Sequence, residues 1–579
     1  MTDQTESTTD VSSTPAPPET PDHAWLSSYP EGVDWSQPVD TTDIVTRFNQ
    51  SVARFGDHTC IEFLGKSWTY KDVDELIGRA ATGLQDLGVG PGTRVGLFLP
   101  NTHYYVIFFQ AVLRCGATVV NFNPLYAKDE VQWQIRDSGT TVMVTLDVEM
   151  LWQKVQPRLD GISLQHVVLC KLADALPFPK NVLMPIVKRS ERARKTKHDK
   201  IVRFEDLLDV DELAECVDVD PEDTAVFQYT GGTTGRPKAA MLSHRALGAN
   251  IDQVHRWMPD LEMGGEAFLG VLPLSHVFAM TVVMNLALST GSRILLLPKF
   301  DLGEVLGTIH KQKPTIFPGV PAIYGAINES RKLSKYDLSS LKFCISGGAP
   351  LPVEVRKRFI KVTGCRLVEG YGLSECAPVA TCNPLVCEGK DGTIGQPLPG
   401  TTVEIRSVDD PRKVQPIGEA GEVCIAGPQL MQGYWQRPEE TADTIRRGFL
   451  HTGDIGIMDS DGFVRIVDRI KDVILRGGYN VYPRMIEEAI YQHPFVAEAC
   501  VIGIESKRKG EVPKAFVRLE EGASLTQDDL LEFLEEKISR LEMPKEIEFR
   551  TDPLPKTTIG KPSRKALRDE ETMRREEAS

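Results

Sequence analysis

From about residue 45 onward, short apolar runs alternate with helical segments, and this alternation constrains the fold more than any other feature of the sequence. Residues 94–99, 117–122 and 141–146 are apolar runs of strand length, and residues 70–87 and 104–115 have the length and apolar spacing of helices. Apolar strands joined by helices form a parallel sheet that helices cover on both faces. We therefore predict an α/β fold.

Changes in this pattern divide the chain into three parts. Residues 1–22 are mostly Ser, Thr, Pro, Asp and Glu, which bury too little apolar surface to fold, so we predict a disordered tail. Residues 392–425 are strand-rich, and after residue 468 the elements become shorter. We predict a large N-terminal domain of layered α/β subdomains plus a strand-rich subdomain at residues 23–468, and a small α+β C-terminal domain at residues 469–579.

Composition excludes several classes of function. The formal net charge is −15, so nucleic acid is not an expected partner. The eleven cysteines include no Cys-x-x-Cys pair, and the spacing of Cys376, Cys382 and Cys387 fits no standard zinc site. The chain begins with no basic and apolar leader, and its longest apolar run, residues 277–288, is shorter than the about 20 residues that span a bilayer. We predict a cytoplasmic protein with reduced thiols.

One segment departs from the alternation of strands and helices. An apolar stretch that ends at Val187 precedes a basic run at residues 188–197. Such a segment fits either a surface loop in solvent or a peripheral contact of residues 177–200 with the anionic inner face of a membrane. The sequence leaves both interpretations open.

The strongest chemical signal is a loop rich in Gly and Thr that follows an apolar strand expected at residues 224–227. Three glycines allow backbone N–H groups to face an anion, three threonines add hydroxyl donors, and a lysine adds positive charge. The spacing matches neither a Walker A motif nor a dinucleotide-binding turn. We predict that the loop binds phosphate through Thr230, Gly231, Gly232, Thr233, Thr234, Gly235 and Lys238.

This loop resembles the phosphate loop of the adenylate-forming superfamily, which includes acyl-CoA synthetases, nonribosomal adenylation domains and beetle luciferases. Other motifs of that superfamily follow in the same order, and the resemblance covers about residues 45–567. It implies an acyl-CoA synthetase-like fold whose small C-terminal domain is mobile about a hinge at Lys471. The nucleotide-binding residues that it implies beyond the loop are Gly347, Gly348, Ala349, Glu369, Gly370, Tyr371, Gly372, Leu373, Ser374, Asp454 and Arg469.

The resemblance also implies individual roles in nucleotide binding. Tyr371 stacks on adenine, which suits the flat face of an aromatic ring. Asp454 accepts hydrogen bonds from the ribose hydroxyls and Arg469 donates to them. Glu375, together with Thr230, holds Mg²⁺.

The catalytic residues that the resemblance implies are Lys561, Thr230, Glu375 and His276. A carboxylate that attacks the α-phosphate of ATP is repelled by it because both are anions, and Lys561 and the metal ion offset this repulsion. His276 lies either beside the acyl pocket or in the core, where its hydrogen-bonding groups have partners. The residues expected to move in for thioester formation with coenzyme A are Gly477, Gly478 and Tyr479.

The segments at residues 25–35, 176–180 and 229–232 resemble those of bacterial long-chain fatty acid–CoA ligases. We therefore predict a long-chain fatty acid–CoA ligase that uses ATP, Mg²⁺, a fatty acid and coenzyme A. One alternative is a fatty acyl-AMP ligase that loads a separate carrier protein. Another is a CoA ligase for medium-chain or aromatic acids. The sequence is also compatible with a homodimer.

Overall fold

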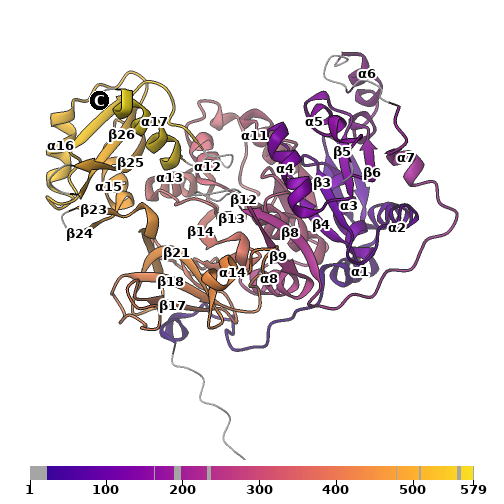
Figure 1. Cartoon of the computed structure of the whole chain (residues 1–579), viewed down its shortest axis with the longest axis horizontal. Coiled ribbons are helices and arrows are strands. Elements are labelled where there is room, and N and C mark those ends of the chain that lie inside the picture. The colour runs from indigo at the N-terminus through magenta and orange to yellow at the C-terminus, as the bar shows by residue number, and fades with distance from the viewer. Residues whose placement is uncertain are drawn as a thin grey trace, which may run out of the picture.

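The computed structural model describes residues 23–161, 164–187, 193, 197–230, 237–476, 479–506, 510–556 and 562–577, so the tail predicted at residues 1–22 lies outside the described residues. The described strands form four sheets. Three of these sheets share one hydrophobic core, whereas the fourth has separate cores. Figure 1 shows the fourth sheet, in yellow, at one end of the molecule.

The first sheet has the strand order β19-β9-β8-β4-β3-β5-β6-β7. Its central strands are parallel, which confirms the predicted α/β pattern, and helices connect them. The strands and the helices between them are β3 (Arg94–Phe98), α3 (His103–Arg114), β4 (Thr118–Asn121), α4 (Lys128–Ser138), β5 (Val142–Leu146), α5 (Glu149–Val155), β6 (His166–Cys170), β7 (Ile201–Arg203), β8 (Thr224–Thr230), β9 (Lys238–Ser243) and β19 (Gly433–Tyr434).

Helix α2 (Tyr70–Asp86), which packs on α3, shows how local sequence fixes an element. The Thr69 hydroxyl accepts the Asp72 N–H at 3.1 Å, and the Asp72 carboxylate accepts the Thr69 N–H at 2.8 Å. This capping box satisfies donors at the helix start. Val73, Ile77 and Leu84 recur at helical spacing and are buried, so one face of the helix packs on the core.

The second sheet has the order β16-β15-β14-β13-β12-β10-β11-β1-β2 and is parallel from β1 to β14. Its carboxyl-terminal strand ends carry the turns that the sequence assigns to the nucleotide site. The elements of this layer are α1 (Ile44–Phe55), β1 (Thr59–Phe63), β2 (Lys66–Thr69), α8 (His244–Arg256), β10 (Ala267–Gly270), β11 (Arg293–Leu296), α11 (Leu302–Gln312), β12 (Ile316–Gly319), α12 (Pro321–Asn328), β13 (Phe343–Ser346), α13 (Val353–Thr363), β14 (Arg366–Gly372), β15 (Val379–Cys382) and β16 (Gln396–Pro397).

The third sheet is antiparallel and contains residues 402–406 and 421–426, the longer strands of the segment predicted to be strand-rich, whereas β16 of that segment belongs to the second sheet. The fourth follows it in the chain after a short 3-10 turn, η8 (Ile470–Asp472). The elements of these two sheets are β17 (Thr402–Arg406), β18 (Gly421–Ala426), α14 (Pro438–Thr444), β20 (Ile445–Arg446), β21 (Phe449–Met458) and β22 (Val464–Arg469), then β23 (Ile474–Arg476), β24 (Tyr479–Val481), α15 (Pro483–Tyr491), β25 (Val496–Ser506), β26 (Gly510–Leu519), α16 (Gln527–Glu535), β27 (Glu546–Arg550) and α17 (Arg564–Glu577).

Short helices complete the described fold. Helices α9 and α10 flank a π-helical turn, η5, in the buried segment that follows His276. The short elements are η1 (Ala24–Ser28), η2 (Gln156–Arg158), η3 (Leu172–Ala175), α6 (Lys180–Val187), α7 (Phe204–Leu207), α9 (Val277–Ala279), η5 (Met280–Asn285), α10 (Leu286–Ser289), η6 (Leu333–Lys335) and η7 (Ser374–Cys376).

Candidate active site

A hydrogen-bonded trio lies where the second sheet meets the third. The Tyr371 hydroxyl, on β14, donates to Asp454 Oδ2 at 2.6 Å, although the two residues are 83 positions apart. Arg469 lies opposite Asp454 on β22, and its Nε is 3.0 Å from Asp454 Oδ1. Burial, followed by the Asp454 charge, raises the pKa of Tyr371 well above its ordinary value, so the hydroxyl remains a donor. Three residues that the sequence analysis took from separate motifs therefore form one group.

A buried carboxylate holds the turn that precedes Asp454. Glu422, on β18, accepts the Gly453 N–H at 3.0 Å, and its other oxygen lies 2.6 Å from His451 Nδ1. The Thr452 hydroxyl accepts the Asp454 N–H at 3.0 Å. The backbone N–H groups of Gly453 and Asp454 are thus both held, which orients the carboxylate toward Tyr371. Glu422 could not be recognised from the sequence, because a single acid in a strand-rich segment carries no signal of such a contact.

The turn of Gly347, Gly348 and Ala349, which resembles the adenine-side turn of the superfamily, follows β13, next to β14. Gly348 in this turn has a φ of +75°, which favours glycine, and a Cβ on Gly347 would lie 3.0 Å from the Phe278 ring. Ala349 follows directly. A Cβ on Gly372, at the end of β14, would lie 1.8 Å from the Pro378 carbonyl oxygen, so this position requires glycine.

A second group surrounds Tyr434, on β19. Its hydroxyl donates to Glu375 Oε1 at 2.6 Å, and Lys238 Nζ lies 5.0 Å from the centre of its ring. Burial, followed by the Glu375 charge, raises the pKa of Tyr434. Lys238 forms an ion pair with Glu440 on α14. The predicted metal-binding carboxylate and the predicted phosphate-binding lysine therefore both contact the same tyrosine, Tyr434.

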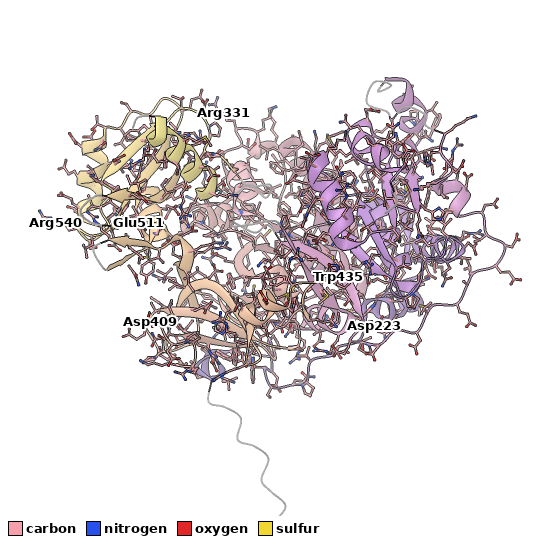
Figure 2. The ribbon with its side chains drawn as sticks, viewed as in Figure 1. Asp223, Arg331, Asp409, Trp435, Glu511 and Arg540 are labelled. Atoms are coloured by element: carbon pink, nitrogen blue, oxygen red, sulfur yellow. The ribbon has the colours of Figure 1, made fainter. Side chains whose placement is uncertain are left out.

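Thr230 lies beside this group, because it ends β8 directly opposite Lys238 at the start of β9. The η7 turn, which carries Ser374 and Glu375 after Leu373, contacts both strands. Lys238 thus belongs to a strand rather than to the predicted loop, since the β8–β9 ladder extends to the loop's last residue. Figure 2 labels Trp435 near these strands, and its ring lies 5.1 Å from that of Phe227.

Tyr434 and Glu440 were not among the site residues predicted from the sequence. Tyr434 left one weak signal, since it and Trp435 directly follow Gly433, a residue with a φ of +147°. Glu440 left none, because acidic residues are ordinary in the first turn of a helix.

Several predicted residues lie outside the described part of the chain. They are Gly231, Gly232, Thr233, Thr234 and Gly235 of the phosphate loop, Gly477 and Gly478 of the coenzyme A segment, and Lys561. For Tyr479 the structure describes only the backbone, which forms the start of β24. Lys556 and Pro562, on both sides of residues 557–561, form a β-bridge.

His276 caps the helical segment α9. Its Nδ1 accepts the Phe278 N–H at 3.3 Å, and its side chain is partly buried. The Phe278 ring packs against Gly347. His276 is therefore connected to the adenine-side turn through Phe278. The position of His276 beside the acyl pocket stays a prediction.

Glu369 precedes Gly370 on β14 and has a buried carboxyl group. Burial raises its pKa to about 8, while the Arg484 charge and a backbone hydrogen bond from Leu351 act in the opposite direction. Since the folded-state pKa exceeds the unfolded one, the folded chain binds this proton more tightly. The stabilisation that protonated Glu369 contributes is therefore fully present below about pH 4.3, the pKa of an unfolded glutamate, and is lost as pH rises through the folded pKa.

Glu369→Gln removes this titration, because the amide keeps the size of the side chain without the charge. We expect the melting temperature of the parent chain to fall relative to that of the variant between pH 6 and pH 9. Differential scanning calorimetry at both pH values checks this. A difference in melting temperature that is the same at pH 6 and pH 9 would contradict the assignment.

Comparison with known proteins agrees with this geometry. A family profile described as AMP-binding enzyme matches residues 48–435, and one described as AMP-binding enzyme C-terminal domain matches residues 485–561. The chain therefore belongs to the AMP-binding enzyme family, and its fold is acyl-CoA synthetase-like.

Individual relatives match along nearly the whole chain. The long-chain-fatty-acid–CoA ligase of Bacillus subtilis (strain 168) is 42% identical over 561 residues, which are 95% of this chain and 98% of the relative. That of Escherichia coli O157:H7 is 39% identical over 555 residues, 94% of this chain and 98% of the relative. The crystal structure of ATP-bound MatB from Rhodopseudomonas palustris has a TM-score of 0.77 at 27% identity, and covers 91% of this chain and 98% of its own.

Proposed function

We propose that the chain is an AMP-forming long-chain fatty acid–CoA ligase, which converts ATP, a fatty acid and coenzyme A to acyl-CoA, AMP and diphosphate through an acyl adenylate. The observation that carries this proposal is that the Tyr371–Asp454–Arg469 trio and the Glu375–Tyr434–Lys238 group are joined by the segment from β14 to η7, on which Tyr371 and Glu375 lie four residues apart. The first group suits a nucleoside and the second suits a charged phosphate chain. The names of the full-length relatives support the choice of acid and thiol.

In the proposed complex, Tyr371 offers one face to adenine while its hydroxyl holds Asp454. The second lone pairs of the Asp454 carboxylate accept hydrogen bonds from the ribose hydroxyls, and Arg469 donates to them. The contacts from Glu422 and Thr452 to the turn keep Asp454 in place without ligand. The nucleoside therefore meets a site that is already oriented, which lowers the entropic cost of binding.

The donors beside Tyr434 fit Mg²⁺, which prefers oxygen ligands. The Glu375 carboxylate and the Thr230 hydroxyl would hold the ion, and when bound it supplies positive charge near the reacting phosphate. Lys238 binds the departing diphosphate, which requires that it leave Glu440. Lys561 contributes the remaining positive charge when the fatty acid carboxylate attacks the α-phosphate.

The second step, attack by the thiol of coenzyme A, uses a different set of groups. We place the boundary between the large and small domains at residues 468 and 469, and the hinge at Lys471 in η8. Rotation about this hinge withdraws Lys561 and brings in the segment of Gly477, Gly478 and Tyr479. A hinge of a few residues between two separately packed cores is a common arrangement for such a motion.

A screen for pyrophosphate release tests the proposal. The purified chain receives ATP, Mg²⁺ and coenzyme A with short-, medium-, long-chain or aromatic acids in separate reactions. We expect the highest rate with long-chain acids, and acyl-CoA as the product. A preference for medium-chain or aromatic acids, or product only when a carrier protein replaces coenzyme A, would support one of the alternatives instead. Absence of AMP with every acid would refute the adenylate mechanism.

Glu440→Gln is expected to lower the KM for ATP, because Lys238 no longer has to leave an ion pair before it binds phosphate. Partly exposed pairs contribute at most about 1 kcal/mol, so we expect a decrease of about two- to fivefold. Initial rates at varied ATP concentration give the value. Glu439→Gln removes a neighbouring exposed charge and serves as the control. Equal effects of both substitutions would contradict the competition.

We also propose that residues 177–200 make a peripheral contact with anionic membranes. No described helix is long and apolar enough to cross a bilayer. However, Phe178, Val182 and Leu183 around the start of α6 are 80%, 55% and 51% exposed, and they lie beside Lys180. Exposed apolar side chains of this kind bury well in the interfacial region of a bilayer.

Flotation with phosphatidylglycerol vesicles tests this contact. The parent chain should float with the vesicles, and Phe178→Ser combined with Leu183→Ser should reduce the bound fraction roughly tenfold. Leu213→Ser alters an apolar residue elsewhere that is 56% exposed, and it should have no effect. An equal loss for both variants, or no flotation of the parent chain, would rule the contact out. Light scattering of the free protein would test the homodimer.

A further inference from the structure

Arg564 lies at the start of α17, three residues after Lys561. Its guanidinium contacts three carboxylates. Its Nη1 lies 3.1 Å from Asp468 Oδ1 and 3.1 Å from Asp472 Oδ2, and its Nη2 lies 2.7 Å from Glu487 Oε2. The Arg564 side chain is only 18% exposed. A guanidinium offers five N–H donors in fixed directions, so it can bind several carboxylates at once, which a lysine cannot do in the same geometry.

The three carboxylates belong to different parts of the chain. Asp468 is on β22, in the third sheet, and its side chain is 1% exposed. Asp472 is in η8, the proposed hinge, and also accepts a hydrogen bond from Arg568 at 2.8 Å. Glu487 is on α15, which packs with the fourth sheet. Arg564 therefore connects the large domain, the hinge and the small domain in the present orientation.

Arg564 also lies at the base of the segment that carries Lys561. The bridge between Lys556 and Pro562 and the hydrogen bond from the Ser563 N–H to the Pro555 oxygen, at 2.7 Å, pair the two sides of this segment. The next residue is Arg564. The contact between Arg564 and Asp468 on β22 therefore fixes the base of the Lys561 segment relative to this strand. The next residue on β22, Arg469, forms the ion pair with Asp454.

Asp468 holds the small domain at a second point. Its Oδ2 accepts the backbone N–H of Arg484, at the start of α15, at 2.7 Å, while Oδ1 accepts the Arg469 N–H at 2.7 Å. Burial raises the pKa of Asp468, although the Arg564 charge opposes this. Loss of one partner in such a buried pair leaves the other charge without compensation, so the pair favours the orientation in which it forms.

We propose that Arg564 is a positioning residue, whose ion pair with Asp468 is a latch that favours the domain orientation described here, and that adenylate formation uses this orientation. The inference rests on the proposed function. Rotation about Lys471 would move Arg564 away from Asp468, because the two residues lie on opposite sides of the hinge. The pair with Glu487 lies within the small domain and would persist in both orientations. The latch thus opposes the change from the first step to the second.

Two variants and a matched control test the latch in separate half-reactions. Asp468→Asn removes the charge on the large domain, and Arg564→Lys keeps a positive charge near Glu487 but cannot reach all three carboxylates. We expect both to slow single-turnover pyrophosphate release roughly tenfold and to leave thioester formation from supplied acyl adenylate within about twofold of the parent rate. Arg568→Gln cuts only the bond to Asp472 and should change neither rate more than about twofold.

A distance measurement tests the latch without using activity. One spin label is placed at the exposed Cys387 of the large domain and the other at Arg540→Cys of the small domain; Figure 2 labels Arg540. Cys216→Ser removes the other exposed cysteine among the described residues. Asp468→Asn and Arg564→Lys should broaden the distance distribution, and Arg568→Gln should not. Unchanged distances in folded variants, or a loss confined to the thioester step, would overturn the proposal. If the parent chain makes no adenylate but the two variants still broaden the distance distribution, the proposed function is refuted and the Arg564–Asp468 latch is retained.

Discussion

Replacing Lys561 with alanine is expected to abolish adenylate formation and to spare thioester formation largely. The fatty acid carboxylate and the α-phosphate repel each other, and in the proposed mechanism Lys561 provides positive charge in the transition state of that step alone. Loss of one such charge from a preorganised site costs roughly 100- to 1000-fold in rate. Single-turnover pyrophosphate release measures the first step, and acyl-CoA formation from a supplied acyl adenylate measures the second.

Lys565→Ala provides the control, since Lys565 is exposed on the first turn of α17, four residues further along the chain. It should leave both half-reactions unchanged. Equal losses of both half-reactions in Lys561→Ala would mean that the lysine supports the fold or binds a common substrate. No loss in either would remove it from the catalytic set.

The strands of the parallel sheets could be predicted from sequence because they are buried on both faces. The apolar runs at residues 94–99, 117–122 and 141–146 correspond to β3, β4 and β5 within two residues at each end. Such runs leave few alternatives, since an apolar segment of that length between helices has to enter the core. The resemblance of ordered motifs then indicated the acyl-CoA synthetase-like fold.

The contacts within the candidate site could not be predicted in the same way. Tyr371 and Asp454 are 83 positions apart and meet only because the second and third sheets pack together. Tyr434 has the composition of a core residue, so nothing in the sequence distinguishes its hydroxyl bond to Glu375 from ordinary burial. Long-range pairs of this kind depend on the packing of sheets, which local periodicity does not encode.

The end of β8 shows a smaller limit of the sequence analysis. The apolar pattern predicted a strand at residues 224–227, but β8 continues to Thr230. The extension arises because β9 pairs with it in an antiparallel ladder from Thr224 to Thr230. Polar residues join a strand when a partner satisfies their backbone groups, whatever their side chains.

Glu375→Gln is expected to reduce adenylate formation by roughly 100- to 1000-fold while preserving the fold. The amide oxygen of glutamine can still accept the Tyr434 hydroxyl, which donates at 2.6 Å in the parent chain, so packing around η7 is retained. The negative charge that would hold Mg²⁺ is lost. The apparent Mg²⁺ affinity in the pyrophosphate-release assay should fall in parallel with the rate.

Tyr434→Phe separates the charge of Glu375 from its orientation. This variant keeps the carboxylate and removes only the hydroxyl that holds it, so we expect a decrease of about three- to tenfold, with a Mg²⁺ dependence close to that of the parent chain. We expect the smaller rate loss for Tyr434→Phe because its freed carboxylate can still reach the ion. In Glu375→Gln the charge is missing, and solvent cannot replace it. Equal defects in the two variants would show that Glu375 acts through Tyr434 and packing rather than through its charge.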